Sequence, residues 1–135
     1  MNLQLETAER ITKAAVARAQ QMGIRVAVAV VDEGGNLLHL SRMDGASFLA
    51  PDIATGKAVT AAAWRMPSAE VEKRAANRDA FFASVSTATR GRAVIGKGAL
   101  PVLISGQVVG AVGASGGTSE EDEEVVKAGI AAVVA

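Results

Sequence analysis

The chain has 135 residues, half of them apolar, and its fourteen basic and fourteen acidic residues give a formal net charge of zero. The chain therefore has no net positive charge to attract nucleic acid or an anionic membrane surface. Its three phenylalanines and one tryptophan are too few to form a surface on which nucleic-acid bases stack. The absence of cysteine excludes disulfides and zinc–thiolate sites, and no apolar run is long enough for a membrane span.

The length predicts one domain over residues 1–135, large enough to bury a core without metal ions or disulfides. The first residues lack the basic and apolar segments of a secretory signal, which favours a cytoplasmic protein. Many of the apolar residues are alanine and valine. Their excess predicts that part of the surface is buried by self-association into a homo-oligomer.

The first half of the chain is expected to contain a helix, a β-hairpin and a second helix. Gly23 ends the first helix, and Pro51 lies in the first turn of the second. Gly56, inside that second helix, costs about 1 kcal/mol relative to alanine and therefore indicates close contact with a neighbouring element. The expected ranges are a helix at 4–22, strands at 26–31 and 37–43 joined by a turn at 32–36, and a helix at 49–65.

The second half is expected to contain a second hairpin and a last helix. Its two apolar runs have no polar alternation, so both strands should be buried and helices should cover both sheet faces. Thr118 and Glu121 form a capping box at the start of the last helix. The expected elements are a helix from Ser68 to about residue 76, a helical turn near Phe81 and Phe82, a short strand at 93–95, strands at 100–104 and 108–112 with the three-residue turn Ser105–Gln107, and the helix after Thr118.

This order of elements predicts an α/β (α+β) fold. Hairpin connections make a sheet largely antiparallel, and strands buried on both faces need helices above and below. We expect a profilin-like, three-layer α/β/α sandwich with a five-stranded, mostly antiparallel sheet.

A charged cluster is predicted where the first hairpin meets the second helix. Arg42 and Asp44, two residues apart at a strand end, project from the same side, and Lys57 can face them from the helix. Such a group suits a ligand carboxylate, with Arg42 as a bidentate donor and Lys57 as a point charge. The alternative is an Arg42–Asp44 pair that only holds the loop.

The glycine-rich end of the second hairpin supplies a second half of the predicted site. The free N–H groups of Ser115, Gly116 and Gly117, just before a helix, are able to bind an anion or a carbonyl oxygen. The segment also matches G-x-S-x-G, but the one histidine precedes it in the chain, in an order that a serine hydrolase does not have. A P-loop-like run at 91–97 has Gly98 where serine or threonine would hold magnesium.

Two further features have alternative interpretations. His39, in the middle of a strand, is either a core or interface histidine or a metal or haem ligand. The acidic run at 120–124 is either a solvated helix start stabilised by the helix dipole or a hard-cation site. The sequence predicts no metal site.

Five collinear segments carry a resemblance to the GlcG and HbpS family, also called the haem-degrading domain family and related to the C-terminal domain of PduO. These segments are Val30-Val31-Asp32-x-x-Gly35-x-Leu37, Arg42-Met-Asp-Gly-Ala46, Asp52-Ile-Ala54-x-x-Lys57-Ala58-x-Thr60-Ala61, Leu100-Pro101-Val102 and Val109-Gly-Ala-Val-Gly113-x-Ser115-Gly-Gly. The resemblance implies a small oligomeric α/β domain, from dimer up to octamer, and some members bind haem or corrinoid. The chain has no tyrosine or cysteine to bind haem iron. The axial ligand is therefore expected to be His39, a methionine or a hydroxyl such as that of Thr60, unless the iron has no protein ligand.

Three functions remain open from the sequence. The first is small-molecule binding of the GlcG/HbpS type, with haem or another carboxylate-bearing molecule as ligand, between the 42–60 region and the 96–117 glycine-rich edge. The second is an enzyme of small-molecule catabolism, an isomerase, lyase or hydrolase acting on a carboxylated substrate, with Asp44 or His39 transferring a proton. The third is a structural assembly subunit. The predicted ligand-binding residues are Arg42, Asp44, Lys57, Thr60, Gly98, Ser115, Gly116 and Gly117.

Overall fold

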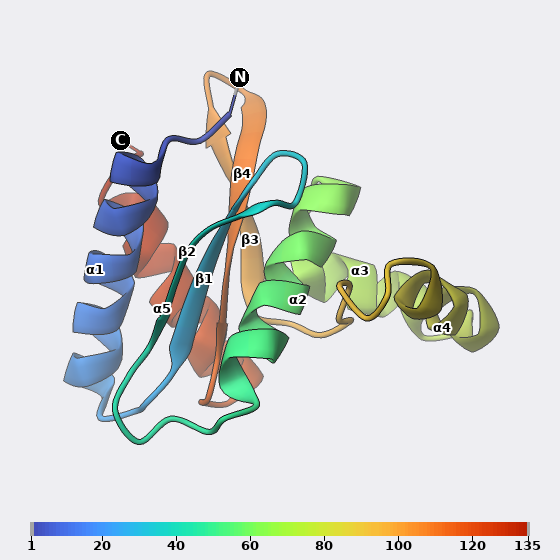
Figure 1. Cartoon of the computed structure of the whole chain (residues 1–135), viewed down its shortest axis with the longest axis horizontal. Coiled ribbons are helices and arrows are strands. Elements are labelled where there is room, and N and C mark those ends of the chain that lie inside the picture. Colours follow the sequence, from blue (N-terminus) through green and yellow to red (C-terminus); the bar gives the residue numbers. More distant parts are fainter. Residues whose placement is uncertain (1, 135) are drawn as a thin grey trace.

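Two β-hairpins lie side by side and form one antiparallel sheet (Figure 1). The computed structural model describes residues 2–134. The first hairpin consists of β1 (Ala27–Asp32) and β2 (Leu37–Arg42), and the second of β3 (Ala99–Ile104) and β4 (Gln107–Ser115). The strand order is β2-β1-β4-β3, with β1 and β4 at the centre. They pair from Ala27 opposite Ser115 to Asp32 opposite Gly110.

Helices cover both faces of this sheet (Figure 1). Helices α1 (Leu5–Met22) and α5 (Ser119–Ala131) pack against one face, and α2 (Ala50–Trp64) packs against the other. Helix α3 (Ser68–Ala75) contacts α2 and β3, whereas α4 (Asp79–Ala88) projects from the side of the molecule. Between residues 2 and 134, no helix is both long enough and apolar enough to cross a membrane.

The sheet is four-stranded among the described residues, so the prediction of five strands was wrong. Residues 93–95, expected as a short strand, run along α2 instead. The backbone N–H of Val94 donates to the carbonyl of Gly56 at 3.2 Å, and the Thr60 hydroxyl donates to the Val94 carbonyl at 2.9 Å. Because helix α2 satisfies these backbone groups, the segment has no need of a strand partner. The close contact expected at Gly56 is with Val94.

The second hairpin differs from its prediction in two ways. Its turn has two residues, Ser105 and Gly106, with φ of 52° and 77°, because two positive φ values match the twist of the flanking strands. Strand β4 is buried along most of its length, but β3 lies at the sheet edge, where Leu103 is 45% exposed.

The helix starts follow the sequence signals in part. The Thr118–Glu121 capping box is present, with both of its hydrogen bonds formed. Helix α3 begins at Ser68 as predicted, but the Ser68 hydroxyl accepts a hydrogen bond from the backbone N–H of Ala99 at 2.9 Å instead of capping the helix. A complete helix, α4, replaces the helical turn expected near Phe81 and Phe82.

Candidate functional site: a cavity with two guanidinium groups

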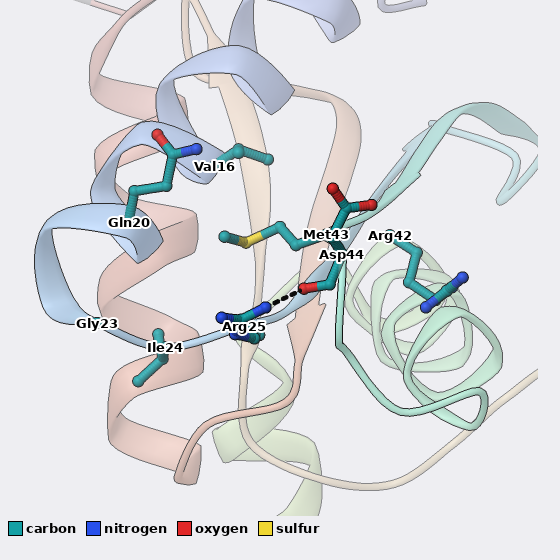
Figure 2. A pocket seen from close by; sticks show the side chains of 8 residues that line it. All are labelled: Val16, Gln20, Gly23, Ile24, Arg25, Arg42, Met43 and Asp44. Carbon is teal, nitrogen blue, oxygen red and sulfur yellow. Dashed lines mark hydrogen bonds between the residues drawn. The ribbon is translucent and has the colours of Figure 1, made fainter.

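A cavity of about 540 Å³ lies between the end of α1 and the end of β2 (Figure 2). Two arginines and one aspartate contribute to its wall, so the lining carries one excess positive charge. Its volume lies in the range of small-molecule sites, roughly 300–1,000 Å³. The lining residues are Val16, Gln20, Gly23, Ile24, Arg25, Arg42, Met43 and Asp44.

Local backbone geometry places Arg25 at the centre of this cavity. Gly23, with φ of 71°, ends α1 and turns the chain toward β1. Arg25 then donates from Nη1 to the backbone carbonyl of Asp44 at 2.8 Å (Figure 2). A Cβ on Gly45 would lie 2.6 Å from Arg25 Nη1, so glycine at this position allows the guanidinium to approach.

Arg42 lies at the outer edge of the cavity, and Figure 2 shows its guanidinium pointing away from Val16 and Gln20. It donates from Nη1 to the carbonyl of Ala46 at 3.0 Å. Arg42 and Asp44 form no ion pair within residues 2–134, so the loop is held by this backbone contact. A guanidinium has five N–H donors, and most of those of Arg42 remain available to a ligand carboxylate.

Lys57 lies elsewhere, in a buried ion pair with Asp122. Its Nζ is 3.2 Å from Asp122 Oδ2 and donates to the carbonyl of Lys97 at 3.2 Å. The other carboxylate oxygen accepts the backbone N–H of Gly117 at 2.9 Å. Burial raises the pKa of Asp122, and Lys57 opposes this effect only in part.

The structure therefore brings Lys57, Gly98 and Gly117 together around Asp122, and not around Arg42 and Asp44. A Cβ on Gly98 would lie 2.6 Å from Lys57 Nζ, so the ammonium fills the space beside this glycine. Of the three amides expected to bind a ligand anion, that of Gly117 already donates to Asp122 Oδ1 at 2.9 Å.

Ser115 and Gly116 lie at the end of the sheet near Arg42 and Arg25, whereas Thr60 lies within α2. Arg42 and Ser115 are both in register with Ala27, so they share a sheet face at the same end, with β1 between them. Gly116 is in close contact with the carbonyl of Arg25, which places the second hairpin beside the cavity wall. Thr60 is fully buried, and its hydroxyl donates a hydrogen bond to the backbone carbonyl of Val94.

His39 lines a neighbouring cavity of about 520 Å³ between α1 and β2. This cavity shares Val16 and Gln20 with the first, so the two adjoin. His39 Nδ1 lies 3.1 Å from Thr12 Oγ1, and the ring has no contact with Asp44 among the described residues. The two residues proposed for proton transfer therefore belong to different cavities.

Sequence reasoning missed Arg25 and Asp122. Asp122 has a detectable signal, because it is three and four residues before Val125 and Val126 and so lies on the inner face of α5. Arg25, just before a strand, has none. Within residues 2–134, no group of three or more histidine, aspartate or glutamate side chains is arranged to hold a metal ion.

GlcG of Escherichia coli strain K12 is 38% identical over 113 residues, which are 84% of this chain and 81% of that protein. A crystal structure of HbpS matches with a TM-score of 0.88 and 33% identity, covering 100% of this chain and 92% of that one. The structure of a PduOC–heme complex matches with a TM-score of 0.86 and 29% identity, covering 98% and 96%.

The family model described as haem degrading protein HbpS-like matches residues 3–131. This match covers nearly the whole chain, and the family resemblance seen in the sequence is thereby confirmed. The chain belongs to the HbpS-like family.

Proposed function

We propose that the protein binds a carboxylate-bearing small molecule in the cavity between α1 and β2, and that haem is its ligand. The observation that carries this proposal is the pair of guanidinium groups, Arg25 and Arg42, in the wall of a cavity of about 540 Å³. Two arginines suit the two propionates of haem, since each guanidinium can bind a carboxylate through parallel hydrogen bonds.

The wall of the cavity also fits the rest of such a ligand. Val16 and Ile24 supply apolar surface, and Met43 supplies a polarizable thioether. The PduOC relative was solved with heme bound, at 29% identity over nearly the same length. These features favour haem over a small dicarboxylate, which has no apolar body to cover.

Haem titration of the full chain, followed by the Soret band, tests the proposal. We expect saturable binding, and an affinity about fivefold to tenfold lower in Arg42→Ala and in Arg25→Gln, because each loses a charge-assisted hydrogen bond. The matched control is Arg74→Ala, which removes an exposed guanidinium from α3 and should leave the affinity unchanged.

Haem dimethyl ester separates the arginine–carboxylate contacts from apolar binding. It should bind more weakly than haem, and its affinity should be the same in Arg42→Ala as in the unmodified protein. A protein that binds neither compound, or arginine variants that bind haem with unchanged affinity, would contradict the proposal.

We also infer a cytoplasmic homo-oligomer. Four exposed large apolar side chains, on β2 and just before α2, support self-association, because an interface would remove their apolar surface from water. They are Leu37, Leu40, Phe48 and Leu49.

A further inference from the structure

A third cavity, of about 440 Å³, lies between β2 and α2, on the sheet face that α2 covers. Leu37 on β2 lies opposite Val31, which packs against α2. Leu40 lies opposite Ala29, which packs against the start of the same helix. Because paired residues on neighbouring strands share a sheet face, both leucines face the α2 layer and line this cavity with apolar surface.

Two arginines from the segment between α4 and β3 also line this cavity. Arg92 donates from Nη2 to the carbonyl of Gly35 at 2.7 Å, which holds its guanidinium beside the turn of the first hairpin. A guanidinium has five N–H donors, so others remain for a ligand. The side chain of Arg90 makes no hydrogen bond or ion pair within residues 2–134. Of the described lining residues, Asp52 alone is acidic, so the lining carries one excess positive charge.

The backbone of Arg90 has a conformation that glycine usually adopts. Helix α4 ends in a Schellman motif, in which the N–H of Gly91 donates to the carbonyl of Ser86 at 2.7 Å and that of Arg90 to the carbonyl of Thr87 at 3.0 Å. Arg90 occupies the left-handed position of this motif, with φ of 57°. A side chain is strained there, and strained positions of this kind cluster at ligand sites.

We propose that this cavity binds a small monocarboxylate with an apolar chain, at a site separate from the cavity with Arg25 and Arg42. The carboxylate accepts hydrogen bonds from Arg90 and Arg92, and the chain covers the two leucines. The single excess charge suits a monoanion, since Asp52 would repel a second negative group.

The two leucines also belong to the surface for which self-association is inferred above. A second copy of the chain that covers Leu37 and Leu40 would form the outer wall of the cavity. Binding is therefore to be measured on the full chain in its native oligomeric state.

Hexanoate, its uncharged amide hexanamide, and acetate test the proposal when they are titrated in parallel. We expect saturable changes in the amide NMR signals of Gly35, Gly56 and Gly91, which line the cavity. Hexanamide should bind about fivefold more weakly or worse, because it lacks the charge. Acetate should do the same, because it lacks the apolar chain. Hexanoate that causes no saturable change at these glycines overturns the proposal.

Arg90→Gly separates ligand binding from a structural role. It should lower the hexanoate affinity by about fivefold or more, yet leave the melting temperature unchanged or raise it, because glycine relieves the left-handed strain. The matched control is Arg65→Gly, at the end of α2, where φ is 55° and the residue does not line the cavity. It should affect the melting temperature in the same way and leave the hexanoate affinity unchanged.

Arg25→Gln distinguishes this site from the one proposed for haem. It should lower the haem affinity and leave the hexanoate affinity unchanged. Hexanoate binding that is lost in Arg25→Gln but retained in Arg90→Gly would overturn the assignment to the cavity between β2 and α2. A protein that binds hexanoate as expected but not haem would contradict the haem proposal alone.

Discussion

Lys57 and Asp122 show how one pair of charges joins three separate parts of the chain. Their side chains are 6% and 5% exposed, and they link α2 and α5 to the loops at Lys97 and Gly117. Two ions removed from water are costly, and their attraction repays that cost only when the remaining hydrogen bonds are made. Here, both carboxylate oxygens have a donor.

Replacing Lys57 with methionine should lower the free energy of unfolding by about 3–5 kcal/mol at neutral pH, because the carboxylate of Asp122 is left buried without its partner. The loss should shrink in acid. The folded-state pKa of Asp122 lies above its ordinary value of 3.8 and rises further without Lys57, so protonation relieves the penalty as pH falls through that raised pKa. Denaturant melts across this pH range measure both effects.

The double variant Lys57→Met with Asp122→Leu provides the control, since it removes both charges and should recover most of the lost stability. The exposed pair Lys73–Glu70 is a matched surface comparison, and Lys73→Met should cost less than about 1 kcal/mol. A Lys57→Met protein as stable as the original at neutral pH would contradict a structural role for the pair.

At the scale of elements, small residues decide how closely α2 packs on the sheet. Gly113 on β4 contacts the carbonyl of Ala54, and a Cβ there would lie 3.0 Å from the backbone nitrogen of Ala58. Ala27 and Ala29 on β1 face Ala54 in the same layer. The alanine-rich sequence of α2 thus has a packing reason, because larger side chains would separate the helix from the strands.

Gly113→Ala should lower the free energy of unfolding by about 1–3 kcal/mol, because the added methyl group overlaps the backbone of α2. Gly96→Ala is the matched control, because the atom nearest to a Cβ added at Gly96 is Lys57 Cδ, at 3.7 Å. This substitution should leave the free energy of unfolding unchanged or raise it slightly. Thermal melts of the two variants give the comparison. Equal melting temperatures would mean that α2 can move away from β4 at no cost.

Local signals in the sequence located most elements. The capping box at Thr118, the glycine end of α1 and the apolar runs of both hairpins act within a few residues of one another, and the structure contains all of them. The 93–95 segment was misassigned because its apolar residues are equally suited to a strand and to packing on a helix. Only contact with α2 distinguishes the two.

At the scale of the whole molecule, the edges of the sheet remain open. Strand β2 is one edge and carries the exposed residues Leu37 and Leu40; Phe48 and Leu49, which precede α2, are exposed as well. The side chain of Phe48 is 83% exposed, which is unusual for a phenylalanine that contacts no other molecule. That residues 1–135 fold as one domain, and that the sandwich is profilin-like, stay predictions.

Phe48→Ser together with Leu40→Ser should lower the oligomeric state, because a self-associating surface loses its two apolar anchors. Light scattering after size-exclusion chromatography measures the mass of each variant. Leu103→Ser is the matched control, since Leu103 is 45% exposed on the opposite edge strand β3 and should leave the mass unchanged. A wild-type protein that runs as a monomer at all concentrations would contradict the prediction.

Family membership, the two hairpins and the ends of α1 and α2 follow from the order of residues, because periodicity, caps and turn residues are local properties. The partners of the charged and polar side chains do not. Lys57 meets Asp122 across 65 residues of sequence, His39 meets Thr12 across 27, and Arg25 meets Asp44 across 19. Each pairing depends on which strands adjoin and which face each helix covers. For that reason, the cavity with Arg25 and Arg42 became visible only in the folded chain.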